Sequence, residues 1–125
     1  MQFLDELFTV QSTEDNENGF TAQLRCNPDH LIYQAHFPGN PITPGACLLQ
    51  TAGELLQRHL GKQLYLKASK NVKYINVLPP AADKVVSFTF SDLTQTESEC
   101  DVQVVIADEA SVYTKMSLSF SYEAL

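Results

Sequence analysis

Three long runs in the last third of the chain alternate apolar and polar side chains, at positions 86–91, 99–106 and 112–122. Alternation with a period of two is typical of half-buried strands, so these runs predict an antiparallel sheet with one apolar face. Residues 45–60 instead repeat leucines at helical spacing and end at Gly61, a common helix stop. A single helix and such a sheet must cover each other. The sequence therefore predicts an α+β fold in which an antiparallel sheet wraps around one long central helix.

Shorter segments complete the predicted fold. Residues 20–26 alternate like a strand, and residues 70–78 look extended up to Pro79-Pro80. The remaining expectations are a short strand or helical turn at 3–10, a polar turn at 12–19 and a short extended piece at 31–33. Because there is no internal repeat and no linker, we interpret residues 1–125 as a single domain.

The most specific stretch runs from His36 to Gly45 and reads His-Phe-Pro-Gly-Asn-Pro-Ile-Thr-Pro-Gly. Its three prolines restrict φ and its two glycines permit positive φ, so the histidine is held on a rigid and unusual backbone. Thr43 is expected to cap the following helix, with Pro44 at the first helical position. Since a helix N-terminus presents unpaired N–H groups, the histidine would be a base beside a ready-made oxyanion site.

Composition excludes several classes of function. A net charge of −7 argues against nucleic acid as a partner. No apolar run approaches the roughly 20 residues that cross a bilayer, and the first residues lack the pattern of a signal peptide. Three widely spaced cysteines, Cys26, Cys47 and Cys100, favour neither a disulfide framework nor a metal site, and they suit a reducing, cytoplasmic location.

The motif and its neighbours resemble a known family. His36-Phe37-Pro38-Gly39, followed by Pro41 and by Pro44-Gly45, is similar to the signature of the FabZ/FabA type of 3-hydroxyacyl-[acyl-carrier-protein] dehydratase. The similarity continues upstream from Asn27-Pro28 to Gln34, and downstream through Lys70-Asn71-Val72-Lys73-Tyr74, Val77, Pro79 and Asp83. The resemblance spans the whole domain and implies the hotdog fold.

The resemblance also implies a function: removal of water from 3-hydroxyacyl thioesters in fatty acid, polyene or polyketide synthesis. Such domains pair edge to edge as dimers, and two interface tunnels take the phosphopantetheine arm of an acyl carrier protein. His36 would remove the proton at C2, the Gly45 amide would polarise the thioester carbonyl, and a carboxylate from the other subunit's central helix would help the hydroxyl leave. Phe37, Pro44 and Ala46 would line the substrate site. No metal and no cofactor beyond the carrier's phosphopantetheine are implied.

The chain departs from the family at the position of the carboxylate. Fourteen residues after His36 stands Gln50, whose amide can donate a hydrogen bond but cannot transfer a proton as a carboxylic acid can. Glu54 follows four residues later, on the same helix face and about 6 Å away. Two interpretations of Glu54 stay open. It is either a general acid one turn from the family position, or a structural acid bonded to the backbone or to Gln50.

Three functions therefore compete. The first is an active dehydratase, expected as a homodimer, that uses His36 with Glu54 or Gln50. The second is a non-catalytic or half-site subunit, paired as a heterodimer with a homologous dehydratase that bears the carboxylate. The third is a hotdog thioesterase in which Glu54 activates water. Lys70 and Lys73, part of a basic stretch between residues 58 and 84, are expected to dock the acidic carrier protein.

Overall fold

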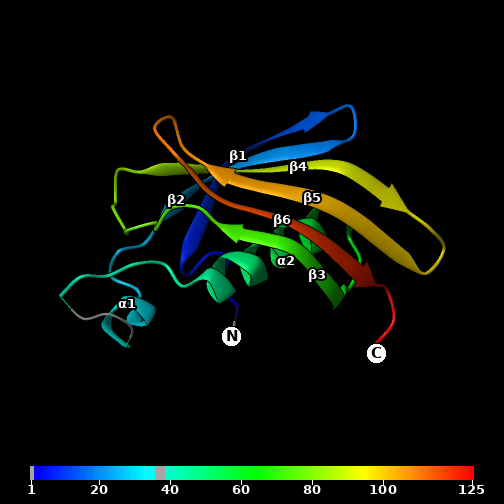
Figure 1. Ribbon diagram of the computed structural model, residues 1–125, viewed down its shortest axis with the longest axis horizontal. Coiled ribbons are helices and arrows are strands. Elements are labelled where there is room, and N and C mark those ends of the chain that lie inside the picture. Colours follow the sequence, from blue (N-terminus) through cyan, green and yellow to red (C-terminus); the bar gives the residue numbers. More distant parts are fainter. Residues whose placement is uncertain (1, 36–38) are drawn as a thin grey trace.

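One curved antiparallel sheet of six strands surrounds a long helix in the computed structural model, which describes residues 2–35 and 39–125 (Figure 1). The strands are β1 (Phe8–Asn16), β2 (Gly19–Cys26), β3 (Tyr65–Tyr74), β4 (Val85–Gln95), β5 (Glu99–Ala107) and β6 (Val112–Ser121), and the helices are α1 (Leu31–Ala35) and α2 (Gly45–Leu60). The order across the sheet is β1-β2-β4-β5-β6-β3, so β1 and β3 are its two edges. The predicted α+β architecture is confirmed.

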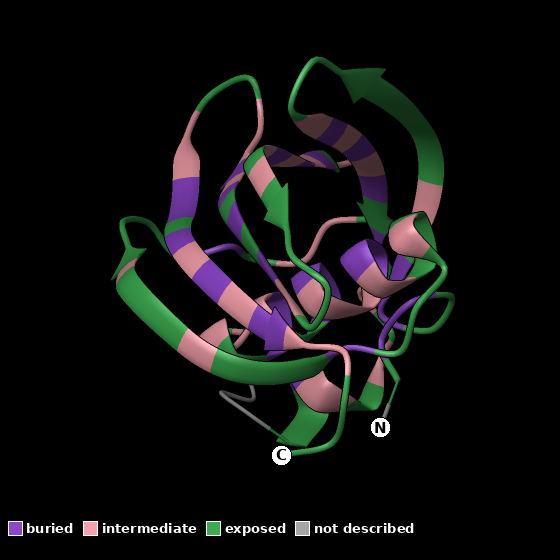
Figure 2. Ribbon diagram, turned by 90° about the vertical axis from the view of Figure 1, so that its right-hand side faces the viewer, coloured by how far each residue is buried: buried purple, intermediate pink, exposed green. Residues whose placement is uncertain are grey.

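The core lies between the sheet and helix α2. Strands β4, β5 and β6 alternate buried with more exposed residues, and Figure 2 shows the buried bands along the strands and on the helix. From α2, Leu48, Ala52, Leu55 and Leu56 are buried. Burial of each such leucine contributes roughly 1.5–3 kcal/mol, so this contact is a main source of stability. The buried apolar residues facing α2 from these strands are Val86, Phe88, Phe90, Cys100, Val102, Val104, Ile106, Met116, Leu118 and Phe120.

Helix α2 has the bounds that the sequence predicts, but its start differs in detail. Gly61 ends the helix in the left-handed conformation, with a φ of 65°, and its N–H donates to the Gln57 carbonyl. Pro44 occupies the capping position instead of Thr43, because the Thr43 hydroxyl is bonded to Tyr33. Neither described helix is long and apolar enough to span a membrane.

Three short segments differ from the sequence predictions. Residues 12–16, expected in a turn, extend β1, because their backbone pairs with β2 although both faces of the strand are exposed there. Residues 31–35 form the short helix α1 instead of an extended piece, and at its start Nδ1 of His30 accepts the Ile32 N–H at 3.0 Å. Strand β3 begins at Tyr65, well before residue 70, and ends at Tyr74.

Candidate active site

The start of helix α2 is covered by an aromatic ring and carries no side-chain cap among the described residues. The first helical bonds run from the N–H groups of Cys47 and Leu48 to the Pro44 carbonyl, at 3.0 and 3.3 Å. A Cβ atom on Gly45 would lie 2.5 Å from two ring carbons of Tyr74, so a larger residue at this position would have to displace the exposed ring. The role predicted for the Gly45 amide, to polarise a thioester carbonyl, stays a prediction.

Two of the cavities beside α2 are lined by predicted substrate residues. The first, of about 430 Å³, lies at the helix start and is lined by Ile42, Thr43, Pro44, Gly45, Leu48, Tyr74, Ile75, Asn76, Val77, Leu78 and Thr114. The second, of about 360 Å³, lies along the helix and is lined by Ala46, Leu49, Gln50, Gly53, Glu54, Gln57, Leu64, Leu66 and Phe120. Of the predicted substrate residues, Pro44 and Gly45 therefore line the first cavity and Ala46 lines the second.

His36, the predicted base, and Phe37 lie outside the described residues. The described residues end at Ala35, the last residue of α1, and begin again at Gly39, whose φ is 87°. The roles assigned to His36 and Phe37 therefore stay predictions.

A buried set of hydrogen bonds connects the segments on either side of His36. The Tyr33 hydroxyl lies 2.8 Å from Oγ1 of Thr43 and 3.0 Å from Sγ of Cys26. The Thr43 N–H also donates to the Leu78 carbonyl at 2.8 Å. Burial raises the pKa of the Tyr33 hydroxyl far above its ordinary value, so this group keeps its proton. Sequence reasoning missed the pairing because a tyrosine and a threonine ten residues apart carry no motif.

Glu54 is bonded to the N-terminal segment of the chain. Its carboxylate accepts the Phe3 N–H at 3.0 and 3.1 Å and the Leu4 N–H at 3.0 Å. The side-chain amide of Gln50 donates to Oε2 of Glu54 at 3.0 Å. These are both kinds of partner that the structural interpretation of Glu54 expected. The side chain of Glu54 is half-buried, and Gln50 is exposed.

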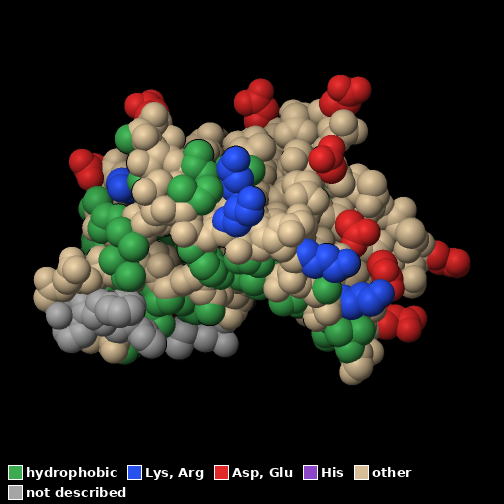
Figure 3. All heavy atoms as spheres, in the orientation of Figure 1, with side chains coloured by type: hydrophobic (Ala, Val, Ile, Leu, Met, Phe, Trp, Pro, Cys, Tyr) green, Lys and Arg blue, Asp and Glu red, His purple; other side chains and the backbone are tan. Residues whose placement is uncertain are grey.

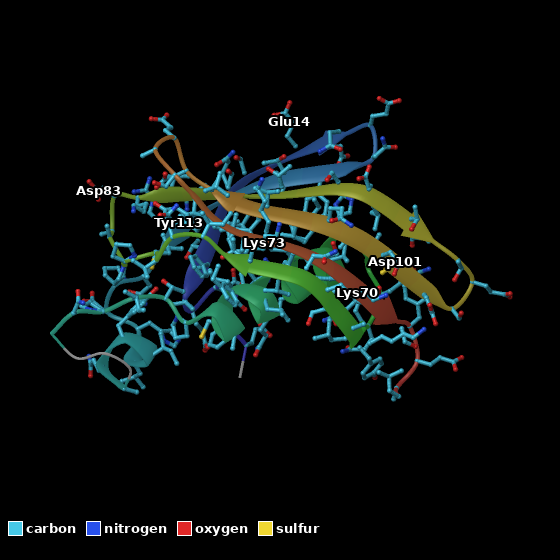
Figure 4. The ribbon with its side chains drawn as sticks, viewed as in Figure 1. Glu14, Lys70, Lys73, Asp83, Asp101 and Tyr113 are labelled. Atoms are coloured by element: carbon cyan, nitrogen blue, oxygen red, sulfur yellow. The ribbon has the colours of Figure 1, made fainter. Side chains whose placement is uncertain are left out.

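The predicted carrier-docking residues, Lys70 and Lys73, are exposed on the edge strand β3. Figure 4 labels both side chains along this strand, and Lys73 lies next to Tyr74, whose ring covers Gly45 at the start of α2. Their docking role stays a prediction. Other basic residues of the same stretch have partners within the chain, since Arg58 pairs with Asp5 at 3.0 Å and Lys67 with Glu99 at 2.5 Å.

A second polar cluster joins the residue before β4, strand β6 and the turn before β6. The Tyr113 hydroxyl donates to Oδ2 of Asp108, and Nζ of Lys84 donates to the Tyr113 oxygen at 3.0 Å. Lys84 also lies 3.6 Å from Asp108. The bond from Tyr113 lowers the pKa of Asp108, and the bond to Tyr113 raises the pKa of Lys84. Because the three groups satisfy one another, we interpret the cluster as structural.

All three cysteines are part of the hydrophobic core. Cys26, Cys47 and Cys100 are buried and unpaired by disulfides. Burial raises the pKa of all three thiols, which keeps them protonated and poorly nucleophilic. The described residues contain no group of three or more side chains that could hold a metal ion.

Sequence comparison finds dehydratases. The 3-hydroxyacyl-[acyl-carrier-protein] dehydratase FabZ of Lactiplantibacillus plantarum is 26% identical over 93 residues, which make up 69% of this chain. The match spans about 63% of the length of that curated relative.

Structural comparison finds the hotdog fold, and a family model identifies the family. A chain of the dehydratase heterocomplex ApeI:P from Xenorhabdus doucetiae has a TM-score of 0.68 at 14% identity, and the match covers 91% of this chain and 97% of that one. A hypothetical thioesterase from Streptococcus pneumoniae, solved with coenzyme A, has a TM-score of 0.65 at 14% identity, with coverages of 94% and 86%. The model of the ApeI-like family, described as ApeI dehydratase, matches residues 11–116. The chain therefore belongs to the ApeI-like dehydratase family.

Proposed function

We propose that this chain is the histidine-bearing subunit of a dehydratase for 3-hydroxyacyl thioesters, and that a homologous partner subunit supplies the catalytic carboxylate. The contacts of Glu54 carry the proposal, since its carboxylate is held by two backbone N–H groups and by Gln50. The family resemblance places Gln50 itself at the carboxylate position, fourteen residues after His36. The chain then provides the base His36 but no acid at the catalytic position.

The proposed reaction divides its steps between two subunits. His36 takes the C2 proton of the bound thioester as general base. The Gly45 amide and the positive end of the α2 dipole stabilise the negative charge that develops on the thioester oxygen. The C3–O bond breaks as the carboxylic acid of the partner gives its proton to the departing hydroxyl. Water leaves, a C2=C3 double bond forms, and solvent returns both groups to their starting protonation states.

Glu54 is poorly arranged to be the acid in this reaction. Both of its oxygens accept hydrogen bonds, and every partner is an N–H donor. A proton on the carboxyl group would displace one of these bonds, which hold the N-terminal segment against α2. Glu54 also lies one helical turn, about 5–6 Å, beyond Gln50, which is a large displacement for catalytic geometry.

A heterodimer of this kind would contain one complete site. It would pair His36 of this chain with the carboxylate of the partner, whereas the other site would hold the partner's histidine opposite Gln50. The structural likeness to a chain of the ApeI:P heterocomplex supports a two-chain enzyme. The substrate would arrive on the phosphopantetheine arm of an acyl carrier protein, as the family resemblance implies.

Complementation between two variants of this chain tests the proposal. Wild type carries His36 and lacks the acid, whereas the double substitution His36→Ala with Gln50→Glu removes the base and introduces the acid. We expect neither protein alone to dehydrate a 3-hydroxyacyl pantetheine thioester. An equimolar mixture at high ionic strength should form the unsaturated thioester, because each mixed dimer contains one complete site. The matched control, His36→Ala with Gln57→Glu, adds the same charge two turns along α2 and should not complement.

Two outcomes would each point to a different function. Dehydration by wild type alone, abolished by Glu54→Gln, would indicate a homodimer that uses Glu54 as its acid. Release of free thiol from acyl thioesters that lack a 3-hydroxyl group would indicate a thioesterase. A mixture without activity, although mixed dimers are detected, would also contradict the half-site assignment.

A further inference from the structure

Strand β3 is a free sheet edge that carries lysines and no acid. Its 10 residues include Lys67, Lys70 and Lys73 and contain no Asp or Glu. It pairs with β6 on one side and is the last strand of the sheet on the other. Exposed apolar side chains stand near both of its ends, with Leu66 42% and Tyr74 55% exposed. An edge with outward-facing backbone groups is a template for another strand.

A bulge places two of these lysines on one face. Lys70 is in register with Ser117 and Lys73 with Lys115, and the register shifts between the two pairs. Since residues two apart on a strand share a face, the shift turns Lys70, Lys73 and Lys115 to the same side of the sheet. This is the side away from α2, because Met116 on β6 is buried and points to the core. We call these three residues the basic strip.

The three lysines of the basic strip form no ion pair with a carboxylate of the described residues. Lys73 and Lys115 stand directly opposite each other, an arrangement that destabilises a strand pair. Lys67 is paired with Glu99, but no ion pair of the described residues involves the strip. Figure 3 shows basic side chains over the region of β3 and β6, while acidic side chains gather mostly along the upper and right margins. Positive charge is thus concentrated beside the free edge of an acidic protein.

We infer that the basic strip selects the subunit that pairs with β3. It disfavours a second copy of this chain and favours a homologous subunit whose edge strand carries carboxylates at the facing positions. The inference rests on the proposed function, which requires a partner subunit. In a two-fold antiparallel pairing the same edge of both copies meets, so the basic strips of the two copies would lie along one interface. Neighbouring strands lie about 4.8 Å apart, well inside the screening length of about 8 Å at physiological salt.

An acidic carrier protein is the other partner that such a strip could attract. The structure favours a strand for two reasons. The lysines lie along a free backbone edge with apolar side chains near its ends. The strip also faces away from α2, whereas the cavity at Gly45 lies at the start of that helix.

A mixing experiment tests the inference with this chain as its own probe. Isotopically labelled wild type is mixed in equal amounts with unlabelled Lys70→Glu, Lys73→Glu protein, and native mass spectrometry counts the dimers at low salt. If the two proteins paired at random, half of all dimers would be mixed. We expect mixed dimers to exceed both homodimers together by severalfold, and to fall toward the random share at about 0.5 M salt. The matched control, Arg25→Glu with Arg58→Glu, makes the same charge change on β2 and α2, away from β3, and should pair at random.

A neutral variant keeps the test decisive if charge reversal impairs folding. Lys70→Gln with Lys73→Gln should lower the homodimer dissociation constant about three- to tenfold relative to wild type, because it removes repulsion without adding attraction. Random mixing, absence of mixed dimers, or an unchanged dissociation constant of the neutral variant would each overturn the inference. Random mixing together with weakened carrier binding would assign the lysines to the carrier. These measurements count assemblies, so they are independent of the complementation assay for activity.

Discussion

Tyr33 and Thr43 stand on opposite sides of the stretch that carries His36, and their side-chain oxygens lie 2.8 Å apart in the buried interior. Cys26 on β2 extends the contact, with its sulfur 3.0 Å from the Tyr33 hydroxyl. Buried polar groups are costly when unpaired, so these side chains fix one another's positions. The bond ties helix α1 to the residue that precedes Pro44 and the start of α2, and it thereby fixes the two anchors of the intervening segment.

Loss of the Tyr33 hydroxyl should destabilise these anchors. Tyr33→Phe leaves Oγ1 of Thr43 buried without this partner, so we expect a loss of about 1–2 kcal/mol in the free energy of unfolding. The backbone N–H of Thr43 should also exchange faster with solvent. It donates to the Leu78 carbonyl, and loss of the side-chain bond of the same residue should let this backbone bond open more often. Urea denaturation and amide exchange measure the two effects.

A double-mutant cycle provides the control for this bond. Thr43→Val removes the same hydrogen bond from the other side with little change in volume. The double variant should therefore lose clearly less stability than the two single losses added together. Additive losses would show that the two hydroxyls act independently and would contradict the assignment.

Residue chemistry alone allowed two roles for Glu54, a general acid or a structural acid, and its bonds to the backbone and to Gln50 are those expected of the structural acid. We expect Glu54→Ala to lower the free energy of unfolding by about 2–3 kcal/mol, because the buried amides of Phe3 and Leu4 lose their acceptor. Glu54→Gln keeps one acceptor oxygen and should lose roughly half as much. Amide exchange at residues 3 and 4 and limited proteolysis of the N-terminal segment report the release directly.

Gln50→Ala is the matched control, because it removes the exposed side-chain donor to the same carboxylate and leaves the bonds of that carboxylate to the Phe3 and Leu4 amides in place. We expect it to change stability by less than about 1 kcal/mol and to leave the N-terminal amides protected. If Glu54→Gln abolished dehydration while stability and N-terminal protection stayed unchanged, Glu54 would be a proton donor and the structural role would be wrong.

Much of the fold was predictable because burial imposes a period on the sequence. Helix α2 has the predicted bounds 45–60, and β4 to β6 have the predicted alternation, since each buries one face only. The polar half of β1 was missed because both faces of this edge strand are exposed, which removes the period. Helix α1, with 5 residues, is too short to show one.

The candidate site was less predictable because it depends on distant contacts. The amide of Phe3 and the carboxylate of Glu54 are 51 residues apart in sequence, and no motif connects them. Thr43 has the chemistry of a helix cap, yet its hydroxyl is bonded to Tyr33 in the core, so Pro44 takes the capping position. In both cases a polar side chain found its partner elsewhere in the fold, which a local sequence pattern does not show.

The cluster of Lys84, Asp108 and Tyr113 should shape the dependence of stability on pH. The Tyr113 bond lowers the pKa of Asp108 in the folded state, so Asp108 contributes stability that is present above its ordinary pKa and is lost as the pH falls through the lowered value. Burial raises the pKa of Tyr113, and the bond to Tyr113 raises that of Lys84. Both therefore contribute stability that is full below their ordinary pKa values, and it is lost as the pH rises through the raised ones.

Tyr113→Phe should consequently make the free energy of unfolding depend less on pH, on both the acid and the alkaline side. Near neutral pH we expect it to lower the free energy of unfolding by about 1–2 kcal/mol, because Asp108 loses its hydroxyl donor. Below about pH 4 and above about pH 10 the difference from wild type should shrink, since the wild-type cluster is itself disrupted there. Urea midpoints measured from acid to alkaline pH test this, with Tyr65→Phe as the matched change at an exposed tyrosine on β3. A difference that stays constant across the whole range would show that Tyr113 contributes packing alone.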